Sequence, residues 1–472
     1  MSSIDALIPD SEQTHQTNSS KWSLSLISSI AIACLSSIQY GYHMAELNAP
    51  EKLIRTSLQL NESQISLITS IFSIGGLVSS TLASTLSVGH GLKVSFILTS
   101  VFYILGSFIE SQAHNYFQML LGRFFSGIGG GLAIVFVPLY VNEVSPLNLR
   151  GFLGSMTQVS VNLGILLTQS LALIWSINEL WRNILWMGVF IGCLDLLLTL
   201  LLLEESPKWL VLNNNNDSEG IRALTKLRNG DIVTSKWEID SWKQEQKRHV
   251  ESVQSNPQLK QLNLYTYLTQ PDYRNSRLVA TFSVLGQQFA GINSVIFYGV
   301  KILADVFPNW AVALNCFISI GNTVITFGAS LFLDRVGRKP MLLTSVFFMG
   351  ISLVGLSGGI IFHQSMLTII SIFTYVGSFA IGCGPIPFLL VSEVSQVEVK
   401  DLAQSWATNC NWVSVFIVGS AFPILNESIG GYTYIIFAAV CLAFGLFIKQ
   451  FIPETKGKET YSEVWNLNAR ED

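Results

Sequence analysis

The sequence predicts an all-α integral membrane protein of twelve transmembrane helices, arranged as two pseudo-symmetric six-helix bundles. Three observations lead to this fold class: few charges, long apolar runs, and motifs that recur along the chain. Charged residues make up only 12% of the 472 positions, and apolar residues make up 50%; soluble domains carry about twice that share of charge. Of the 58 charged residues (27 basic plus 31 acidic), 21 fall between Glu204 and Arg277. This uneven distribution leaves long charge-free runs elsewhere in the chain.

Apolar runs of membrane-spanning length account for most of the sequence. A helix needs about 20 apolar residues to cross the hydrocarbon core of a bilayer. Two runs carry one charge each, Arg123 in 117–141 and Asp195 in 184–203. A transmembrane β-barrel would show alternation over about ten residues, which these runs lack. Ten further runs contain no Asp, Glu, Lys or Arg: 24–44, 65–88, 94–109, 152–177, 278–300, 310–333, 341–361, 366–392, 402–424 and 432–448.

The placement of Lys and Arg predicts the orientation. Twelve spans put both termini on one side of the membrane. If that side is the cytosol, 22 of the 27 basic residues lie in inner segments, four lie in outer segments, and Arg123 lies within a span. Because cytosolic segments are enriched in Lys and Arg, we expect both termini to be cytosolic. The first twenty residues lack a basic n-region, so the first span should act as an uncleaved anchor.

A charged middle segment divides the chain. The expected division is a cytosolic tail (1–23), a first bundle (24–203), a cytosolic linker with short helices (204–277), a second bundle (278–452) and a second tail (453–472). PLYVNEVSPLNLRG at 138–151 matches PFLLVSEVSQVEVKD at 387–401, which sets Glu143 against Glu393, 250 positions apart. Glu205 and Glu454, 249 apart, follow the last span of each half. Duplicated halves are typical of carriers that rock about a midplane site.

Charged residues at the ends of the spans predict a cytosolic latch. Loop 334–339 reads Asp-Arg-Val-Gly-Arg-Lys, whereas the matching loop 88–93 lacks the acid and one arginine. Opposite charges that pair only when helices close at the membrane boundary would favour an outward-open state. The alternative is that the basic residues only mark orientation. The residues expected to form the latch are Glu143, Arg150, Glu205, Asp334, Arg335, Arg338, Glu393, Lys400 and Glu454.

Two spans carry features expected of a solute site. The seventh holds three carboxamides within seven residues, Gln287, Gln288 and Asn293. Unpartnered carboxamides are costly at membrane depth, and each both donates and accepts, as a sugar hydroxyl does; hydrogen bonds between helices are the alternative use. The tenth span contains Pro385 and Pro387, which cannot donate backbone hydrogen bonds, so this helix should bend or break. A broken helix is tolerated in a membrane where it lines a cavity, so it is a candidate gate.

Taken together, these motifs resemble the sugar porter family of the major facilitator superfamily, which includes glucose facilitators and proton-linked hexose symporters. The resemblance runs from about Gln39 to Lys458. In the first span, Gly41-Tyr42-His43 with Glu46-Leu47-Asn48-Ala49-Pro50 resembles a fungal sub-branch of vacuolar-sorting-associated, sugar-transporter-like proteins. Seven motifs carry the family resemblance: Gly122-Arg123-Phe124, Glu143-Val144-Ser145-Pro146 with Arg150-Gly151, Glu205-Ser206-Pro207-Lys208-Trp209-Leu210, Gln287-Gln288 with Gly291-Ile292-Asn293, Asp334-Arg335-x-Gly337-Arg338, Gly384-Pro385-Ile386-Pro387 and Pro453-Glu454-Thr455-Lys456-Gly457.

The resemblance implies a major facilitator fold and a set of sugar-binding positions. Two positions depart from the family pattern, since relatives commonly have Glu in place of Ala380 and Trp in place of Phe388. Aromatic rings suit the apolar C–H faces of a pyranose. The implied hydrogen-bonding residues are Gln158, Gln287, Gln288, Asn293 and Asn322, and the implied aromatic residues are Phe379, Phe388 and Trp412.

The mode of transport depends on two titratable residues within the spans. Proton-linked relatives carry Asp after Gly-Tyr in the first span, where this chain has His43. An imidazole titrates near physiological pH and could carry a coupled proton, but we favour the alternative of a hydrogen-bonded packing histidine. Asp195 is the second candidate, to be neutralised by burial or placed near a boundary. The expected mode is facilitated uniport, with proton-coupled symport as the alternative.

The predicted function is alternating-access transport of a monosaccharide (hexose) or a similar polyol, without enzymatic activity. No nucleophile–base pair, metal-ligand spacing or phosphate loop is legible, so neither a cofactor nor a metal is expected. The alternative is a sugar sensor or trafficking-related membrane protein that does not transport. The expected partners are a sugar and the lipid bilayer, with no nucleic acid, and the oligomeric state stays open. We expect a vacuolar or other internal membrane, with the plasma membrane as the alternative.

Overall fold

The computed structural model describes residues 22–146, 149–255, 262–458 and 461–466, and within these ranges it is helical and has no strand. Ten stretches are long and apolar enough to cross a membrane. One of them, Val397–Phe451, contains two long helices. A further crossing is divided at Gly291 into two shorter helices, so it falls outside those ten. The described residues therefore give the twelve crossings that the apolar runs predict.

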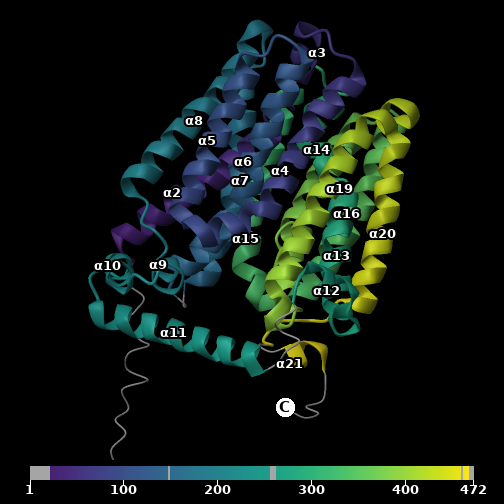
Figure 1. The fold of residues 1–472 in the computed structure, drawn as a ribbon. Helices are drawn as coiled ribbons and strands as arrows, with labels where there is room; N and C mark the ends of the chain where they lie inside the picture. Colours follow the sequence, from purple (N-terminus) through teal and green to yellow (C-terminus); the bar gives the residue numbers. More distant parts are fainter. Residues whose placement is uncertain (1–21, 147–148, 256–261, 459–460, 467–472) are drawn as a thin grey trace, which may run out of the picture.

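The first half contains six long helices that pack on one another, α4 and α5 against α6, α2 against α7, and α5 against α8. The short helix α3 (Glu51–Ser57) joins the first two at one end of the bundle, which we call the α3 end (Figure 1). The six helices are α2 (Leu24–Ala45), α4 (Glu62–His90), α5 (Leu92–Ser111), α6 (Tyr116–Val144), α7 (Arg150–Trp175) and α8 (Trp181–Leu202), with the 3-10 turn η1 (Asn178–Leu180) before α8.

The second half repeats this pattern, with α16 packed on α17 and α20, and α13 packed on α19. The halves meet mainly where α4 packs on α19 and α7 packs on α15. The helices of the second half are α13 (Arg274–Phe289), α14 (Ile292–Ala304), α15 (Ala311–Val336), α16 (Arg338–Ile361), α17 (Ser365–Ser378), the π-helical η4 (Phe379–Cys383), α18 (Ile386–Glu393), α19 (Lys400–Ile429) and α20 (Thr433–Phe451), with the 3-10 turns η3 (Pro271–Tyr273), η5 (Val397–Val399) and η6 (Gly430–Tyr432).

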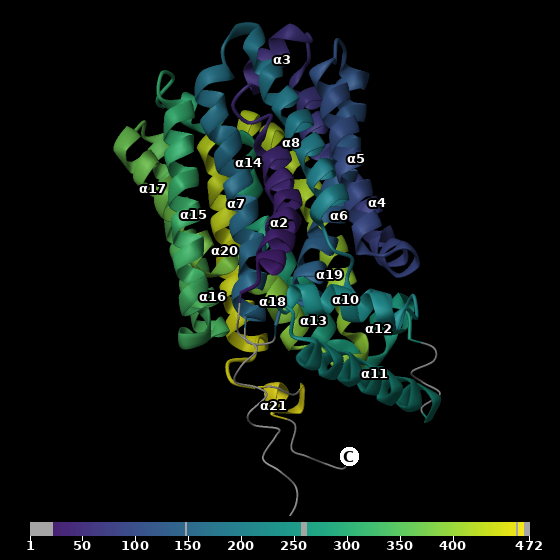
Figure 2. The same cartoon turned by 90° about the vertical axis from the view of Figure 1, so that its left-hand side faces the viewer.

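Short helices gather at the opposite end of the bundle, which we call the linker end. The long helix α11 lies across this end, beneath the membrane-spanning helices (Figures 1 and 2). Four of these helices, α9 to α12, lie in the segment between the halves. The helices at this end are α9 (Pro207–Leu212), α10 (Asp217–Leu227), α11 (Ile232–Ser255), α12 (Leu264–Thr269) and α21 (Tyr461–Trp465).

Two spans of the second half are interrupted, the seventh and, as its prolines predict, the tenth. The seventh span breaks at Gly291, whose φ of 92° is left-handed and whose Cβ, if present, would lie 2.5 Å from the ring of Phe437. Glycine is therefore the residue that fits this kink. The tenth span changes from α-helix to the π-helical η4 and resumes at Ile386. Pro385 and Pro387 lie at this restart, as the loss of their backbone donors predicts.

The repeated glutamates perform one structural task in both halves. Glu205 Oε1 accepts from the backbone N–H groups of Leu92 (2.9 Å) and Lys93 (3.1 Å) at the start of α5. Glu454 accepts from those of Arg338 (3.0 Å) and Lys339 (3.1 Å) at the start of α16. Burial raises the pKa of Glu205 above its usual value, while the backbone donors oppose that rise. Each carboxylate thus satisfies the free donors of a helix N-terminus and faces the positive end of its dipole.

Removal of either glutamate should destabilise the protein by about 0.5–2 kcal/mol, the usual cost of a lost helix cap. We expect Glu205→Ala and Glu454→Ala each to lower the thermal unfolding midpoint in detergent, measured by intrinsic fluorescence. Glu219→Ala is the matched control, because Glu219 is exposed on α10. If the two cap variants unfolded at the temperature of this control, the capping role would be wrong.

Candidate functional site

The carboxamides of the seventh span form one hydrogen-bonded chain at the kink. Asn293 Nδ2 donates to Gln288 Oε1 (2.5 Å), and Gln288 Nε2 donates to Asn411 Oδ1 on α19 (2.6 Å). Gln288 Nε2 also lies 3.3 Å from Gln287 Oε1. All four side chains are buried. The break at Gly291 brings Asn293 back towards Gln288, so that three helices, α13, α14 and α19, share one polar chain.

Gln287 connects this chain to the broken tenth span. Its Nε2 donates to the carbonyl oxygens of Cys383 (2.7 Å) and Gly384 (2.9 Å). In a regular helix the Cys383 carbonyl would accept from the residue four positions later, but that residue is Pro387, which has no N–H. Gln287 therefore satisfies a carbonyl that the proline leaves free. The glutamine and the proline form one structural unit across two spans.

Trp412 lies beside these carboxamides and contacts the first half. It follows Asn411 in α19, is 0% exposed, and packs edge-on against Tyr40 of α2 (6.0 Å between ring centroids) and Phe72 of α4 (6.1 Å). Its indole N–H is buried and has no hydrogen-bond partner. A buried donor without a partner is costly, so this N–H is available to a bound polar solute. The carboxamide chain and Trp412 together form a site where the two halves touch.

The other four predicted sugar-binding residues lie on neighbouring elements and are half-buried. Gln158 on α7 and Asn322 on α15 each lie one turn from the hydrogen bond that joins Asn162 Nδ2 to Thr326 Oγ1 (2.8 Å) between the halves. Asn322 Oδ1 is buried without a partner. Phe379 lies in η4, and Phe388 packs against an apolar cluster at the linker end that includes Tyr267 and Ala403. Among the described residues, no hydrogen bond ties Gln158 or Asn322 to the carboxamide chain.

An apolar cavity lies apart from this chain. It has a volume of about 400 Å³ and lies between α15, α16 and η4. None of the eight predicted sugar-binding residues lines this cavity, so it does not indicate where a sugar binds. Its lining residues are Ile325, Gly328, Ala329, Phe332, Val336, Met341, Thr344 and Ile381.

The predicted latch residues pair inside each half in this structure. Glu143 accepts from the Ser206 hydroxyl, and Glu393 accepts from Arg338 Nη2 (3.0 Å) and from the Thr455 hydroxyl. Among the described residues, no ion pair joins a latch residue of one half to one of the other. Glu205 and Glu454 act as the helix caps described above.

Four latch residues remain. Arg150 is half-buried and its Nε has no hydrogen-bond partner. The Arg335 guanidinium lies 6.0 Å from the Phe332 ring centroid. Lys400 is exposed at the first residue of α19. The side chain of Asp334 lies outside the described residues.

Polar contacts between the halves concentrate instead at the α3 end. Lys301 Nζ on α14 lies 3.6 Å from Glu51 Oε1 and 3.1 Å from Glu62 Oε2 of the first half. Asn48 donates to the carbonyl of Ile296 (2.7 Å) and accepts from the Val300 N–H (2.9 Å). Asn48, which lies between α2 and α3, thus hydrogen-bonds directly to the backbone of α14. These contacts hold the halves together at the α3 end.

A disulfide should form across the halves in this state. The Ser420 hydroxyl donates to Ser70 Oγ, and the two oxygens are 2.8 Å apart. Sulfur atoms at these positions need to move only slightly to reach the S–S distance of about 2.0 Å. We expect the double variant Ser70→Cys, Ser420→Cys to cross-link under mild oxidant, seen as a gel-mobility shift of protein cut by protease in the linker. Each single variant is the control for the six native free cysteines; equal shifts in single and double variants would contradict this contact.

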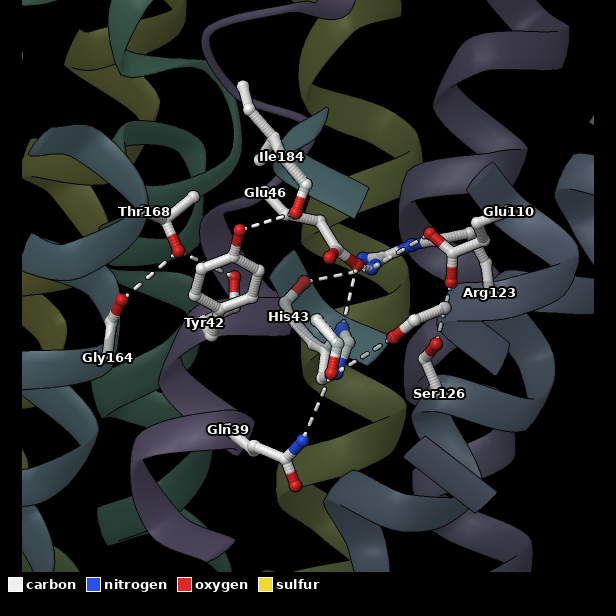
Figure 3. Close-up of polar contacts among 12 residues, drawn as sticks. Gln39, Tyr42, His43, Glu46, Glu110, Arg123, Ser126, Gly164, Thr168 and Ile184 are labelled. Atoms are coloured by element: carbon white, nitrogen blue, oxygen red, sulfur yellow. Dashed lines mark hydrogen bonds and ion pairs between the residues drawn. The ribbon is translucent and has the colours of Figure 1, made fainter. Parts of the chain in front are cut away.

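His43, the first proton-coupling candidate, lies in a sealed polar cluster of the first half (Figure 3). Its Nδ1 is 2.9 Å from Glu46 Oε1, its Nε2 is 3.5 Å from Ser107 Oγ, and its ring stacks on Tyr103 at 4.9 Å. Arg123 Nη1 donates to the same Glu46 oxygen (2.6 Å) and to the His43 carbonyl (2.8 Å). His43 is therefore buried and hydrogen-bonded within an ionic cluster.

Asp195, the second candidate, lies in α8 and is 0% exposed. Its Oδ2 accepts from the hydroxyls of Ser36 (2.8 Å) and Ser100 (3.0 Å), while Oδ1 is buried without a partner. Asp195 thus lies inside the bundle, and the hydroxyls of α2 and α5 satisfy one of its oxygens. Asp195 and His43 have different hydrogen-bond partners, Ser36 and Ser100 for the first and Glu46 and Ser107 for the second.

The sequence did not indicate that two residues of the ionic cluster, Glu46 and Glu110, are buried. Glu46 and Glu110 fall just past the ends of the apolar runs 24–44 and 94–109, so they read as boundary charges. The structure places both inside the bundle at 0% exposure. A signal was present, because an arginine within a span, here Arg123, needs a carboxylate partner at membrane depth. Glu46 and Glu110 are the acids nearest the ends of the two spans that pack beside it.

Comparison with known proteins agrees with this architecture. A family described as "Sugar (and other) transporter" matches residues 29–465. The probable metabolite transport protein YBR241C of Saccharomyces cerevisiae is 41% identical, covering 93% of this chain and 95% of that protein. Vacuolar protein sorting-associated protein 73 of the same yeast is 34% identical over 93% of this chain and 96% of its own length. The facilitated glucose transporter member 1 of Gallus gallus is 31% identical, covering 94% of each chain.

The solved structures show the same fold. The inward-open conformation of the xylose transporter XylE from E. coli superposes with a TM-score of 0.78 at 21% identity, covering 94% of this chain and 99% of that one. The chain belongs to the sugar transporter family, as a sugar porter of the fungal branch of the major facilitator superfamily. Such proteins move sugars across membranes and are not enzymes. The resemblance to the sugar porter family and the all-α membrane fold, both expected from the sequence, are confirmed.

Proposed function

We propose that the protein carries a monosaccharide, a hexose or a related polyol, by alternating access between two bundles that move as units, residues 24–203 and 278–452. The observation that carries this proposal is the chain Asn293–Gln288–Asn411, which ends beside Trp412 at the contact between the halves. Carboxamides exchange hydrogen bonds with hydroxyls, and the indole offers an apolar face and a free N–H. A sugar bound there would touch both halves, so its binding can follow their relative movement.

The sugar would take over contacts that the carboxamides now make with one another. We propose that Gln287, Gln288 and Asn293 turn to the hydroxyls, and that Gln158 and Asn322, one turn from the contact between α7 and α15, close on the sugar. Phe379 and Phe388 would line the path on the tenth span. The names of the glucose and xylose transporters among the similar proteins support a sugar of this size.

The contacts at the α3 end describe one state of the cycle. We propose that the linker end faces the cytosol, together with both termini, because most Lys and Arg lie at that end. The α3 end is then the outer gate, closed here by Lys301 and Asn48. The predicted latch of Glu143, Arg150, Asp334, Arg335, Arg338, Glu393 and Lys400 would join the halves at the linker end in the opposite state. An internal membrane, such as that of the vacuole, is supported by the name of the 34% identical yeast protein.

Tracer flux in reconstituted liposomes tests this function. We expect purified protein to carry labelled D-glucose or D-xylose down a gradient, with unlabelled sugars competing according to how well they fit the site. A labelled amino acid serves as the control solute. Absence of flux for every sugar in a panel of hexoses, pentoses and polyols would contradict the proposal. Facilitated uniport stays a prediction, while one observation, the buried Glu110, favours proton-coupled symport.

A further inference from the structure

The apolar cavity between α15, α16 and η4 opens to the outside of the second half. Four residues of its wall are exposed, Phe332, Val336, Thr344 and Ile381. α15 runs along the outer edge of the second half, beside α17 (Figure 2). Exposed apolar side chains on a membrane-spanning helix contact the hydrocarbon of the bilayer. The cavity is therefore a groove in the lipid-facing surface, which we call the α15–α16 groove.

The dimensions of the α15–α16 groove fit one acyl chain. Its wall runs along α15 from Ile325 to Val336, eleven residue steps or about 16 Å at about 1.5 Å per residue. One leaflet contributes about 15 Å to a hydrocarbon core of about 30 Å. The volume of about 400 Å³ also lies within the roughly 300–1,000 Å³ of ligand pockets. The groove thus follows the depth of one leaflet, as an acyl chain does.

The chemistry of the wall also favours an acyl chain. Of the eight described residues that line the groove, Thr344 alone carries a hydrogen-bonding hydroxyl. A sugar would therefore find too few partners for its hydroxyls. Gly328 leaves part of the wall open, because a Cβ at this position would meet no atom within 4 Å. This open space admits the methylene groups of a lipid.

Basic side chains surround the linker end of the groove. The Arg335 guanidinium lies 6.0 Å from the ring centroid of Phe332, which lines the groove. Lys339 Nζ donates to the carbonyl of Lys449 (3.1 Å), and Lys456 Nζ donates to the carbonyl of Arg335 (2.5 Å). Within the part of the chain that the structure describes, no acidic side chain forms an ion pair with any of these four cations. Their charges are available to a ligand.

The described acids at this end already have partners. Glu454 accepts from the backbone N–H groups of Arg338 (3.0 Å) and Lys339 (3.1 Å), and Glu393 accepts from Arg338 Nη2 (3.0 Å). Cations at the edge of a leaflet attract anionic lipid headgroups. The planar guanidinium of Arg335 also suits the oxygens of a phosphate. Charge complementarity therefore favours an anionic phospholipid over a neutral lipid.

We propose that the α15–α16 groove binds one acyl chain of an anionic phospholipid from the leaflet at the linker end, and that Arg335, Lys339 and Lys456 bind the headgroup of this lipid. The groove lies apart from the carboxamide chain. The inference is therefore independent of the sugar transport proposed above, and it adds a lipid as a second ligand of the protein.

The bound lipid would support the broken tenth span. Ile381 of η4 lies in the wall of the groove, and two residues later Cys383 has the carbonyl that Gln287 binds. A Cβ at Gly382 would lie 2.6 Å from the carbonyl oxygen of Met341, another wall residue, so η4 and α16 are in close contact. An acyl chain fills the space beside this contact and restores van der Waals partners to its walls. Lipid binding should therefore raise the thermal unfolding midpoint.

Two lipids with the same chains test the headgroup site. Native mass spectrometry of the full-length protein in detergent measures the dissociation constants of dioleoyl-phosphatidylglycerol and dioleoyl-phosphatidylcholine. We expect the wild type to bind the first lipid at least fivefold more tightly. Arg335→Gln should weaken the binding of phosphatidylglycerol about fivefold, because one Lys or Arg near a membrane surface contributes about 1 kcal/mol. Arg222→Gln, at an exposed position on α10, should bind as wild type does.

A pair of glycine variants tests the groove itself. Gly328→Leu places a side chain in the open space of the groove. We expect this variant to lose the preference for phosphatidylglycerol and the rise in unfolding midpoint that this lipid causes. Gly321→Leu is the matched control, because Gly321 lies on the same helix and a Cβ there also meets no atom within 4 Å, but Gly321 does not line the groove.

Equal affinity of the wild type for both lipids would overturn the proposal, as would an unchanged preference in Gly328→Leu. If these variants fail to fold, cross-linking of the wild type decides. A phosphatidylglycerol with a photoreactive diazirine in its acyl chain should label residues 325–344, and unlabelled phosphatidylglycerol should compete better than phosphatidylcholine. Labelling spread evenly over the exposed faces of α8 and α20 would contradict the site. None of these readouts measures sugar flux, so their failure leaves the transport function untouched.

Discussion

Replacing Arg123 with alanine is expected to destabilise the protein by about 3–5 kcal/mol, the usual result of removing one partner from a buried ion pair. The change leaves Glu46 and Glu110 sealed together without a cation, and it removes the donor to the His43 carbonyl. It also removes the guanidinium that lies against Phe72. The expected readouts are a large drop in the thermal unfolding midpoint in detergent and a low yield of folded protein.

The pH dependence of the destabilisation by Arg123→Ala identifies its cause. Protonated carboxyls need no cation, so the difference from wild type should shrink as the pH falls. Arg222→Ala is the matched control, because Arg222 is exposed on α10. The unfolding midpoint of Arg123→Lys should lie between those of Arg123→Ala and Arg222→Ala, since lysine keeps the charge but loses the forked donor geometry. A midpoint for Arg123→Ala within error of that control would show that Glu46 and Glu110 do not depend on this arginine.

Replacing Gln288 with leucine is expected to give the second largest effect, a loss of sugar transport of about 10- to 100-fold. Gln288 donates to Asn411 and accepts from Asn293, so leucine of similar volume leaves two buried carboxamides short of a partner. Each such loss costs about 1–3 kcal/mol, and about 1.4 kcal/mol corresponds to a factor of ten in binding. The expected signature is a raised KM for D-glucose or D-xylose uptake together with a reduced rate.

The control for this experiment is Gln244→Leu, an exposed glutamine on α11. Protein yield and unfolding midpoint should be measured for both variants, so that lost flux is not confused with lost folding. Wild-type KM in a well-folded Gln288→Leu protein would mean that the carboxamide chain only holds helices together. In that case the sugar would have to bind elsewhere between the halves.

Much of the fold could be predicted from the sequence, because membrane-spanning runs and prolines act locally. The twelve crossings follow from where charges are absent, and the break at Pro385–Pro387 follows from residues that cannot donate a backbone hydrogen bond. The break at Gly291 could not be predicted in this way, since glycines also lie within unbroken spans. The pairing of Gln287 with the carbonyl freed by Pro387 could not be predicted, since the two lie on different spans. A sequence shows that a carbonyl lacks its donor but not which side chain replaces it.

The site could be predicted less completely. The density of carboxamides in the seventh span indicates Gln287, Gln288 and Asn293, and in the structure these contact one another directly. Their further partner Asn411, on another span, could not be predicted. Glu46 and Glu110 were missed because burial depends on how far a helix continues past its apolar run. The latch was predicted to join the two halves, whereas in this structure Arg338 and Glu393 pair within one half.

Transport by the cross-linked double variant Ser70→Cys, Ser420→Cys tests the claim that flux requires the halves to separate at the α3 end. The account predicts that oxidation abolishes exchange of labelled D-glucose or D-xylose in liposomes, and that a reductant restores it to the level of the unoxidised protein. Full exchange by protein that gels show to be completely cross-linked would contradict it.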